Sequence, residues 1–274
     1  MGLFIMDKLK KLKDIIKDMR SVLVAYSGGV DSTFLLKVAA EVLGNKVLAV
    51  TATSPTYTQE ELFSSKRMVR SLGVKHLVIK TCELEDKRFA ANPANRCYYC
   101  KKELFSSLKK IAKSKKLNSV VEASNITDAQ DFRPGVKAKQ ELNVRSPLVE
   151  AGLSKDEIRK LSKALGLSTW DKPNLACLAS RIPYGKPITQ GILSRINKAE
   201  SVLRELGFRQ VRVRHNENTC RIEVTKRDIP ILVNKSNKVI ECLKQVGYNY
   251  ITLDLEGYRV GSMNPAPSIQ KKYR

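Results

Sequence analysis

Short apolar runs alternate with amphipathic segments over most of the chain. The runs 22–26 and 46–53 are dominated by apolar residues, which is typical of strands buried on both faces of a parallel sheet. Residues 6–19 repeat apolar side chains at the spacing of an amphipathic helix. Strands that alternate with helices form β-α-β units, so the pattern predicts an α/β fold with a doubly wound, mostly parallel sheet. Further strands are expected at 75–81 and 118–124, and further helices at 30–44, 58–72 and 99–115.

The pattern changes after the Pro- and Gly-containing stretch 180–191, "SRIPYGKPITQG". Residues 210–215 and 220–225 alternate in polarity around the turn "NENT", which predicts a hairpin. Helices are expected at 189–206 and 227–246, and a last strand at 250–259. We therefore predict a larger α/β domain at residues 1–184 and a smaller α+β domain at residues 185–274.

The chain of 274 residues carries 50 Lys and Arg against 27 Asp and Glu, a formal net charge of +23. Such an excess favours polyanionic partners, including nucleic acids, nucleotides and phosphorylated substrates. The charge is spread along the chain rather than gathered in a tail, so lysine-rich helix faces in water explain it equally well.

The sequence contains no apolar run of about 18 residues, the length that a membrane span requires. Its first residues lack the apolar core and cleavage site of a secretory leader, so we expect a cytoplasmic protein. Disulfides are not expected in that compartment. The cysteines are Cys82, Cys97, Cys100, Cys177, Cys220 and Cys242.

The stretch 25–33, "AYSGGVDST", carries the strongest local signal. A predicted strand leads into a glycine turn, and the turn opens a helix. Gly28 and Gly29 allow the backbone to approach an anion closely, and the amides of the first helical turn point toward it. Asp31 suits Mg²⁺ beside phosphates better than it suits the phosphates themselves. Hydroxyl donors to the same anion are expected from Ser27, Ser32 and Thr33.

This stretch resembles the S-G-G-x-D-S signature of the PP-loop pyrophosphatases, whose fold is of the adenine nucleotide alpha hydrolase-like (HUP) type. They cleave ATP between the α and β phosphates and adenylate an oxygen of the substrate. The resemblance implies that ATP also meets the end of the second strand, at Thr51, Ala52 and Ser54. It points further to Asn125 and Arg133 in the loop 123–135, although a solvated loop would carry the same residue types.

Several stretches together resemble one PP-loop family, the LarE sulfur transferases. Their order and spacing extend the resemblance from about residue 20 to residue 260. The stretches are "AYSGGVDST", "NRCYYCK", "DFRPG", "SPLVEAGLSKDEIRKLSKALGL", "WDKP", "ACLASRIPYG" and "VRVRH".

The resemblance implies a role in making the nickel-pincer nucleotide cofactor of lactate racemase. The substrate would be pyridinium-3,5-dicarboxylate mononucleotide, whose carboxylates are adenylated by ATP and then converted to thiocarboxylates in succession. Adenylation supplies the leaving group that a carboxylate lacks, and a thiolate is the nucleophile that the second step needs.

The family's donor cysteine corresponds to Cys177, and Ser180 and Arg181 would face the same catalytic pocket, which also needs Asp31. Arg212 and Arg214 match the family's basic residues for the substrate phosphate. A solvated strand face would show the same alternation of arginines. Glu223 and Asp228 either orient these arginines or are ordinary surface carboxylates.

The C-x-x-C pair, Cys97 and Cys100, has several interpretations, among them zinc, redox chemistry and an iron-sulfur cluster. A closed zinc site needs four ligands, and the chain has no second C-x-x-C and only two histidines. In one branch of the LarE family three cysteines hold a 4Fe-4S cluster, which Cys97, Cys100 and Cys177 would supply here. In another branch the donor cysteine gives up its own sulfur. That chemistry needs only the donor cysteine, so the additional C-x-x-C pair favours the 4Fe-4S cluster as the expected cofactor, although both sulfur sources remain open. Core positions are expected for Cys82, Cys220 and Cys242.

Two other hypotheses fit parts of the sequence. A PP-loop tRNA thiolase would suit the positive charge, but the sequence shows no recognisable RNA-binding module, so a nucleic-acid partner is not expected. A non-catalytic nucleotide- or RNA-binding module would not need Asp31 and its hydroxyl neighbours. We expect an enzyme with ATP and Mg²⁺ as cofactors, and a homo-oligomer as in LarE relatives.

Overall fold

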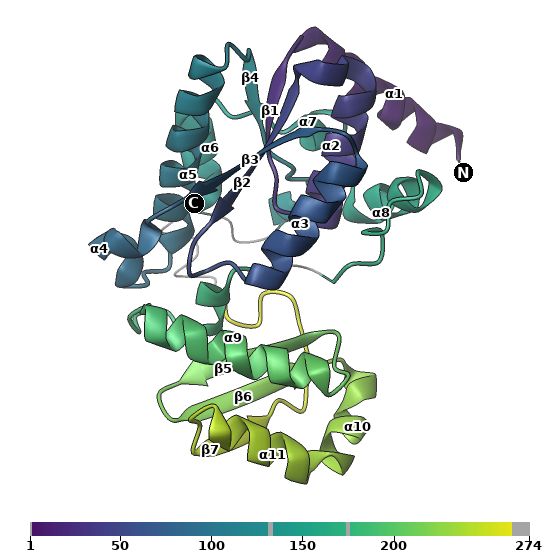
Figure 1. Ribbon diagram of the computed structural model, residues 1–274. Helices are drawn as coiled ribbons and strands as arrows, with labels where there is room; N and C mark the ends of the chain where they lie inside the picture. Colours follow the sequence, from purple (N-terminus) through teal and green to yellow (C-terminus); the bar gives the residue numbers. More distant parts are fainter. Residues whose placement is uncertain (1, 131–133, 174–175, 265–274) are drawn as a thin grey trace. The chain divides into compact units, whose positions relative to one another are not determined.

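The computed structural model describes residues 2–130, 134–173 and 176–264, which fall into two units (Figure 1). Unit 1 comprises residues 2–83, 95–130 and 134–173. Unit 2 comprises residues 84–94 and 176–264.

Unit 1 contains a four-stranded parallel sheet with the order β3-β2-β1-β4. In this order β1 lies between β2 and β4, with Val24 opposite Ala49 on one side and Val121 on the other. The carboxyl ends of β1 and β4 are therefore adjacent, at the point where the strand order reverses and open α/β sheets bind ligands. The strands are β1 (Val22–Ala25), β2 (Val47–Thr53), β3 (Lys75–Lys80) and β4 (Ser119–Val121).

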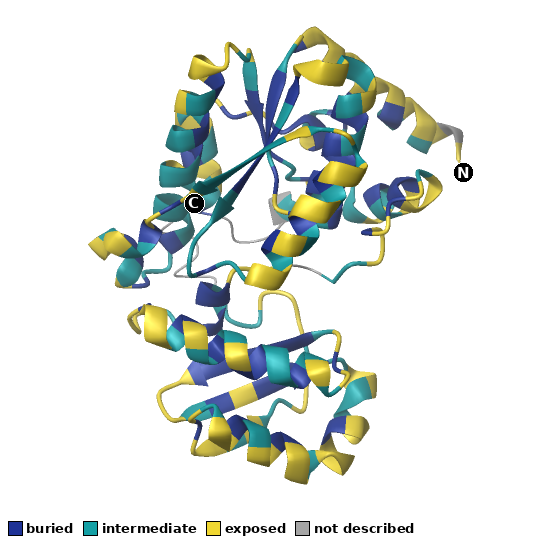
Figure 2. Cartoon of the chain, in the orientation of Figure 1, coloured by how far each residue is buried: buried dark blue, intermediate teal, exposed yellow. Residues whose placement is uncertain are grey.

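The two faces of this sheet carry separate hydrophobic cores, because successive strand residues point to opposite sides. Val22 and Val24 belong to a core that includes Phe34 of α2 and residues of α1 and α8. Leu23 belongs to the other core, with Phe105 of α5. Burial on both faces is visible along β1 in Figure 2 and confirms the predicted α/β fold. The helices are α1 (Leu3–Asp18), α2 (Val30–Leu43), α3 (Gln59–Ser71), α5 (Arg96–Ser114), α6 (Gly135–Glu141), α7 (Pro147–Glu150) and α8 (Lys155–Ala164).

Unit 2 is built on a three-stranded sheet of order β5-β6-β7, in which the predicted hairpin is present. β5 (Val211–Asn216) and β6 (Thr219–Val224) are antiparallel, and β7 (Tyr250–Leu253) is parallel to β6. Its core combines these strands with α9 (Gln190–Glu205), α10 (Ile229–Asn234) and α11 (Ser236–Gln245). The single helix predicted at 227–246 is thus two helices, and the last strand is shorter than predicted because the chain turns at Gly257.

Residues 84–94 and 176–184 belong to unit 2, although the sequence pattern placed them in the N-terminal domain. The reason is the buried Asn92, which follows α4 (Lys87–Ala90). Its side-chain amide donates to the carbonyls of Pro183 and Lys186 at 2.8 and 2.9 Å. Its own carbonyl accepts from the amide of Gly185 at 2.9 Å. No local pattern in residues 84–94 predicts partners ninety residues away.

In the part of the chain that the structure describes, no helix is long and apolar enough to cross a membrane.

Replacing Asn92 with Ala should lower the free energy of unfolding by about 1–3 kcal/mol, because buried carbonyls lose their donor. Asn92 also has a positive φ of 56°, which Ala tolerates less well. The exposed Asn143, with φ 49°, is the matched control, since its side chain makes no hydrogen bond that the structure shows. Urea unfolding of both variants separates the two effects, and equal losses would contradict the role given to the amide.

Candidate functional site

The turn between β1 and α2 requires glycine at position 28. Its φ of 71° lies in the left-handed region, and a Cβ there would collide with the hydroxyl of Ser65 on α3. Gly29 has extended backbone and stands at the N-cap position of α2. Only Gly28 therefore needs to be glycine for conformational reasons, whereas both glycines were predicted to serve the close approach.

The predicted hydroxyl donors separate into two groups. Ser27 and Ser32 lie at the turn, with their oxygens 3.1 Å apart, and Ser32 Oγ also donates to the carbonyl of Gly29. Thr33 is fully buried, and its hydroxyl pairs with that of Tyr26 at 3.2 Å. Thr33 therefore supports the turn from the core side. Ser27 is exposed at the turn, whereas Ser32 is buried and its hydroxyl contacts Ser27 and the carbonyl of Gly29.

Two lysines from later segments reach this turn, and sequence reasoning missed both. Lys155 Nζ lies 2.5 Å from Asp31 Oδ2. Lys172 Nζ donates to the carbonyl of Gly28 at 2.9 Å, and burial lowers the pKa of Lys172. The stretches "SKDE" and "WDKP" that contain them contributed to the resemblance, but nothing local marks a lysine as a partner of a distant turn.

Asp31 keeps one oxygen available for a metal ion. Its Oδ1 is buried and has no hydrogen-bond partner among the described residues. A carboxylate oxygen is a suitable Mg²⁺ ligand, so this side chain fits the predicted ion.

The end of β2 presents a polar cluster at Ser54. The Ser54 hydroxyl donates to Glu83 Oε1 at 2.5 Å, and Thr56 donates to the same oxygen at 2.8 Å. Thr51 is buried, and its hydroxyl donates to the carbonyl of Tyr26 and lies within hydrogen-bond distance of His76 Nε2. Thr51 therefore links β2 to the start of the turn between β1 and α2. Ala52 is half-buried and adds only backbone groups at this edge.

The loop after β4 is organised by its own side chains. Asn125 is buried, and its Oδ1 accepts from the amide of Thr127 at 2.9 Å. Its Nδ2 finds no hydrogen-bond partner within residues 2–130, 134–173 and 176–264. One end of Asn125 is thus used by the loop and the other remains for a ligand. Arg133, the other predicted ATP contact in this loop, lies outside the described residues.

In unit 2, Cys177 is exposed and caps the short 3-10 turn η4 (Leu178–Arg181). Arg181 holds this turn from within. Its Nη1 donates to the carbonyls of Ala176 and Cys177 at 2.6 and 2.9 Å, and to Ser180 Oγ at 3.0 Å. The guanidinium is only 3% exposed, so Arg181 positions the backbone around Cys177 and does not present its charge at the surface of a pocket as predicted.

Arg181 is paired in turn with Glu200 of α9, through Nε–Oε1 at 2.8 Å and Nη2–Oε2 at 3.0 Å. Glu200 also accepts from the amide of Val213 on β5. Burial acts to raise the pKa of Glu200, but the charge of Arg181 and its hydrogen bonds outweigh it, so the pKa lies below its ordinary value of 4.5. Glu200 thereby ties the Cys177 turn to both α9 and β5.

Arg212 and Arg214 lie on β5, each 8% exposed, which excludes the solvated strand face. Arg214 donates from Nη1 to the carbonyl of Ser180 and from Nη2 to Glu223 Oε2 at 2.6 Å. Its Nε has no partner in the described part of the chain. Burial lowers the pKa of Arg212, and the neighbouring charge of Arg181 lowers it further.

The two carboxylates that were uncertain in the sequence have different roles. Glu223 is fully buried and orients Arg214, directly and through Ser262. Asp228 accepts from Thr225 at 2.5 Å and lies 3.9 Å from Arg227, so it organises its own turn rather than the arginines of β5.

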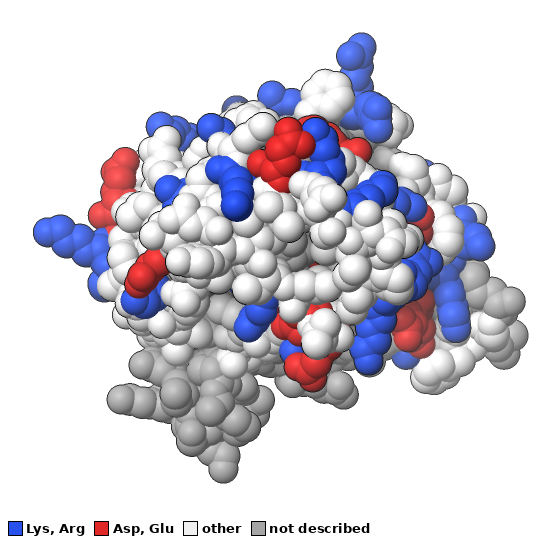
Figure 3. Space-filling model, turned by 90° about the horizontal axis from the view of Figure 1, so that it is seen from below, with Lys and Arg blue, Asp and Glu red and all other residues white. Residues whose placement is uncertain are grey.

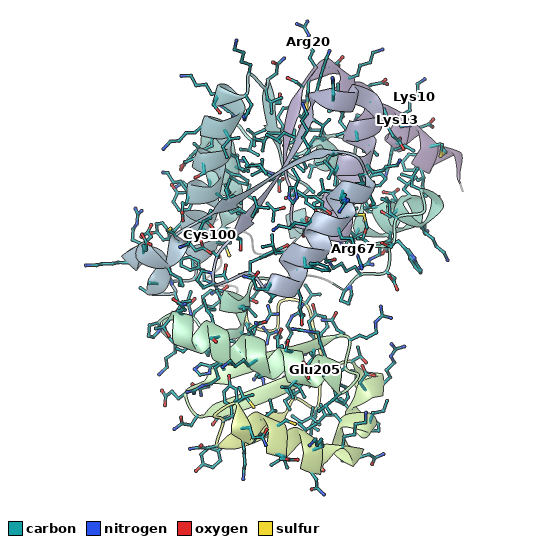
Figure 4. All side chains as sticks on the ribbon, in the orientation of Figure 1. Lys10, Lys13, Arg20, Arg67, Cys100 and Glu205 are labelled. Atoms are coloured by element: carbon teal, nitrogen blue, oxygen red, sulfur yellow. The ribbon has the colours of Figure 1, made fainter. Side chains whose placement is uncertain are left out.

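The predicted cluster cysteines lie in different units. Cys97 and Cys100 are one turn apart at the start of α5 in unit 1, where Figure 4 labels Cys100, and Cys177 belongs to unit 2. Among the described residues, no group of three or more His, Cys, Asp or Glu side chains is arranged to hold a metal ion. The 4Fe-4S site at Cys97, Cys100 and Cys177 therefore stays a prediction.

The remaining cysteines only partly follow the prediction. Cys220 is buried, and burial raises the pKa of its thiol to about 12. Cys82 is exposed rather than in the core, because it follows the end of the edge strand β3, and Cys242 is half-buried.

Lys and Arg side chains are scattered over the face shown in Figure 3, with Asp and Glu between them. Among the described residues on that face, the Lys and Arg side chains form no continuous basic surface of the kind that tracks a nucleic-acid backbone.

A scan against protein-family profiles finds no match. Among curated proteins, the chain is 42% identical over 259 residues to an uncharacterised protein of Synechocystis sp., covering 94% of this chain and 97% of the relative. It is 38% identical over 250 residues to pyridinium-3,5-bisthiocarboxylic acid mononucleotide synthase of Lactiplantibacillus plantarum, covering 91% of each chain. A shorter match, 31% identical over 168 residues, covers 60% of this chain and 36% of argininosuccinate synthase of Campylobacter lari.

Replacing Glu200 with Gln should lower the free energy of unfolding by about 3–5 kcal/mol at neutral pH, because Arg181 is left as an unpaired buried charge. The depressed pKa of Glu200 means that its contribution is present above pH 4.5 and is lost as the pH falls below that value. The variant should lack this part of the acid destabilisation in urea unfolding measured across pH.

Glu205→Gln is the matched control, since Glu205 is exposed on the same helix (Figure 4). It should change the free energy of unfolding by no more than about 0.5 kcal/mol. Equal effects of the two substitutions would show that the Arg181–Glu200 pair does not hold the turn.

Proposed function

We propose a reaction for this chain, which belongs to the LarE family of PP-loop ATP-dependent enzymes. The chain converts pyridinium-3,5-dicarboxylate mononucleotide to the bisthiocarboxylate. The observation that carries the proposal is the presence in one chain of two sites of complementary chemistry, each within its own unit. Unit 1 has a glycine turn with a metal-competent carboxylate, and unit 2 has an exposed thiol on a buried, arginine-rich scaffold.

In the first half-reaction a carboxylate oxygen of the substrate attacks the α-phosphorus of ATP and pyrophosphate leaves. The turn at Gly28 and the first amides of α2 would receive the phosphates. Asp31 would hold Mg²⁺ through the oxygen that lacks a partner, and the ion supplies charge neutralisation at the phosphates. Asn125 Nδ2 and the end of β2 near Ser54 are the proposed contacts for the nucleoside.

The substrate phosphate is assigned to Arg212 and Arg214. Arg181, Arg212 and Arg214 gather around the buried carboxylates of Glu200 and Glu223, which leaves an excess of positive charge in a poorly solvated place. A phosphate dianion would offset that excess, and Arg214 Nε has a donor to offer it.

In the second half-reaction Cys177 is the proposed sulfur donor. Its thiolate attacks the acyl carbon of the adenylate, and AMP leaves with the bonding electrons to give a thioester. A base then takes the Cα proton of Cys177, and the Cβ–Sγ bond breaks. The product carries a thiocarboxylate and residue 177 becomes dehydroalanine, so each chain supplies one sulfur.

Ser180 and Arg181 set the position of the thiol in this scheme. Arg181 binds the carbonyls of Ala176 and Cys177, which belong to the peptide bonds before and after Cys177, and Arg214 binds the carbonyl of Ser180. Because these contacts fix the backbone at both ends of the turn, the thiol is presented with little loss of conformational freedom on reaction. Cytoplasmic location and a homo-oligomeric state remain part of the proposal.

Cys177→Ala should abolish the thiocarboxylate product while pyrophosphate release from ATP and the dicarboxylate nucleotide continues. Intact-mass analysis of the wild-type protein after turnover should show the loss of one H₂S at residue 177. Cys242→Ala, a half-buried thiol of the same unit, is the control and should keep both steps. Sulfur transfer by the Cys177→Ala protein would refute the assignment.

Iron and acid-labile sulfide in anaerobically purified protein separate the two sulfur sources. An iron-free protein that loses H₂S supports donation by Cys177. Stoichiometric iron and sulfide, with Cys177 intact after turnover, would contradict it and favour the 4Fe-4S site at Cys97, Cys100 and Cys177.

A further inference from the structure

Asp31 is neutralised by a lysine from a distant segment. Lys155 lies 124 residues along the chain from Asp31, and its Nζ is 2.5 Å from Oδ2. The other oxygen, Oδ1, is buried and has no hydrogen-bond partner in the described ranges. Oδ2 of Asp31 is therefore occupied by the Lys155 ammonium, and Oδ1 is left for a second ligand.

The backbone of Lys155 is firmly anchored, so that only its side chain is free to change position. Its amide donates to Thr127 Oγ1 at 3.1 Å, and the neighbouring Leu153 carbonyl accepts from the amide of Ile126. Ser154 and Glu157 form a capping box at the start of α8. Lys8 pairs with Glu157 and fastens the helix to α1.

The placement of Lys155 opposes the local electrostatics of its own helix. It is the first residue of α8, where the helix dipole favours anions and disfavours a cation. The ammonium of Lys155 instead contacts Asp31 in the turn between β1 and α2. This ion pair offsets the unfavourable interaction of Lys155 with the helix dipole.

We propose that Lys155 is an exchangeable counter-ion of Asp31 that is displaced by Mg²⁺ and then binds the pyrophosphate portion of ATP. This inference rests on the proposed ATP step and adds a residue to it. In the nucleotide-free protein the ammonium compensates the charge of Asp31. A divalent cation on the same carboxylate repels it, and the polyphosphate that enters with the metal offers the ammonium a new anion. The long flexible stem of lysine allows this exchange without movement of the anchored backbone.

The exchange has two consequences of opposite sign. Without the ammonium, Asp31 has no competitor, so a divalent cation should bind the nucleotide-free protein more tightly. Without the same ammonium, the leaving pyrophosphate loses a cation, so its release should slow. A salt bridge that only stabilises the fold would produce neither effect.

The test compares Lys155→Met, which keeps length and removes charge, with Lys160→Met on the exposed face of the same helix. The first measurement is a titration of nucleotide-free protein with Mn²⁺, followed by electron paramagnetic resonance. We expect Lys155→Met to bind Mn²⁺ roughly tenfold more tightly than wild type, as removal of a partly exposed competing charge implies. Lys160→Met should match wild type, and Asp31→Asn should lose the site.

The second measurement is pyrophosphate release with ATP, Mg²⁺ and the dicarboxylate nucleotide. Lys155→Met should lower the maximal rate by about 10²–10³-fold, the cost of losing one cation at a developing charge. Lys155→Arg should recover much of the rate and retain the weak Mn²⁺ binding of wild type, because the cation is restored.

The outcomes distinguish this inference from the proposed function. Unchanged or weaker Mn²⁺ binding in Lys155→Met overturns the counter-ion role even if the enzyme is active. An unchanged rate of pyrophosphate release overturns the contact with the leaving group. Absence of pyrophosphate release in the wild-type protein refutes the proposed function, and the Mn²⁺ titration still decides whether Lys155 competes for Asp31.

Discussion

Burial of β1 on both faces and pairing on both edges is the constraint that organises unit 1. Val22, Leu23 and Val24 have less than 2% exposure, and β1 is hydrogen-bonded to β2 and β4. A strand enclosed in this way has room for polar groups only where it ends. The residues that follow it, Gly28 and Asp31, therefore lie at the carboxyl edge of the sheet, beside the loop that leaves β4.

That edge gathers charge from segments far apart in sequence. Lys155 and Lys172 both contact the turn between β1 and α2. The amide of Thr127 donates to Asn125 Oδ1, and the hydroxyl of Thr127 accepts a hydrogen bond from the amide of Lys155. The turn, the β4 loop and the start of α8 are thus one hydrogen-bonded arrangement. Its positive charges suit the polyphosphate of ATP, and its carboxylate suits the ion that accompanies it.

Unit 2 holds several guanidiniums, those of Arg181, Arg212 and Arg214, in a poorly solvated interior. Buried charges are tolerated only when paired and hydrogen-bonded. Glu200 and Glu223 provide the pairing, and backbone carbonyls of the Cys177 turn take the remaining donors of Arg181. The same contacts that stabilise the arginines therefore fix the backbone on both sides of Cys177.

The sequence by itself determined the features whose cause is local. Apolar periodicity predicted the parallel sheet and the hairpin, and nine residues from 25 to 33 predicted the strand, glycine turn and helix start. The tertiary structure decided which distant groups meet. It assigned Arg181 to Glu200, Lys155 to Asp31 and Asn92 to the carbonyls near Gly185, and it distributed the cysteines between two units. Backbone conformation follows from neighbours along the chain, whereas the partner of a buried charge depends on which segments pack against it.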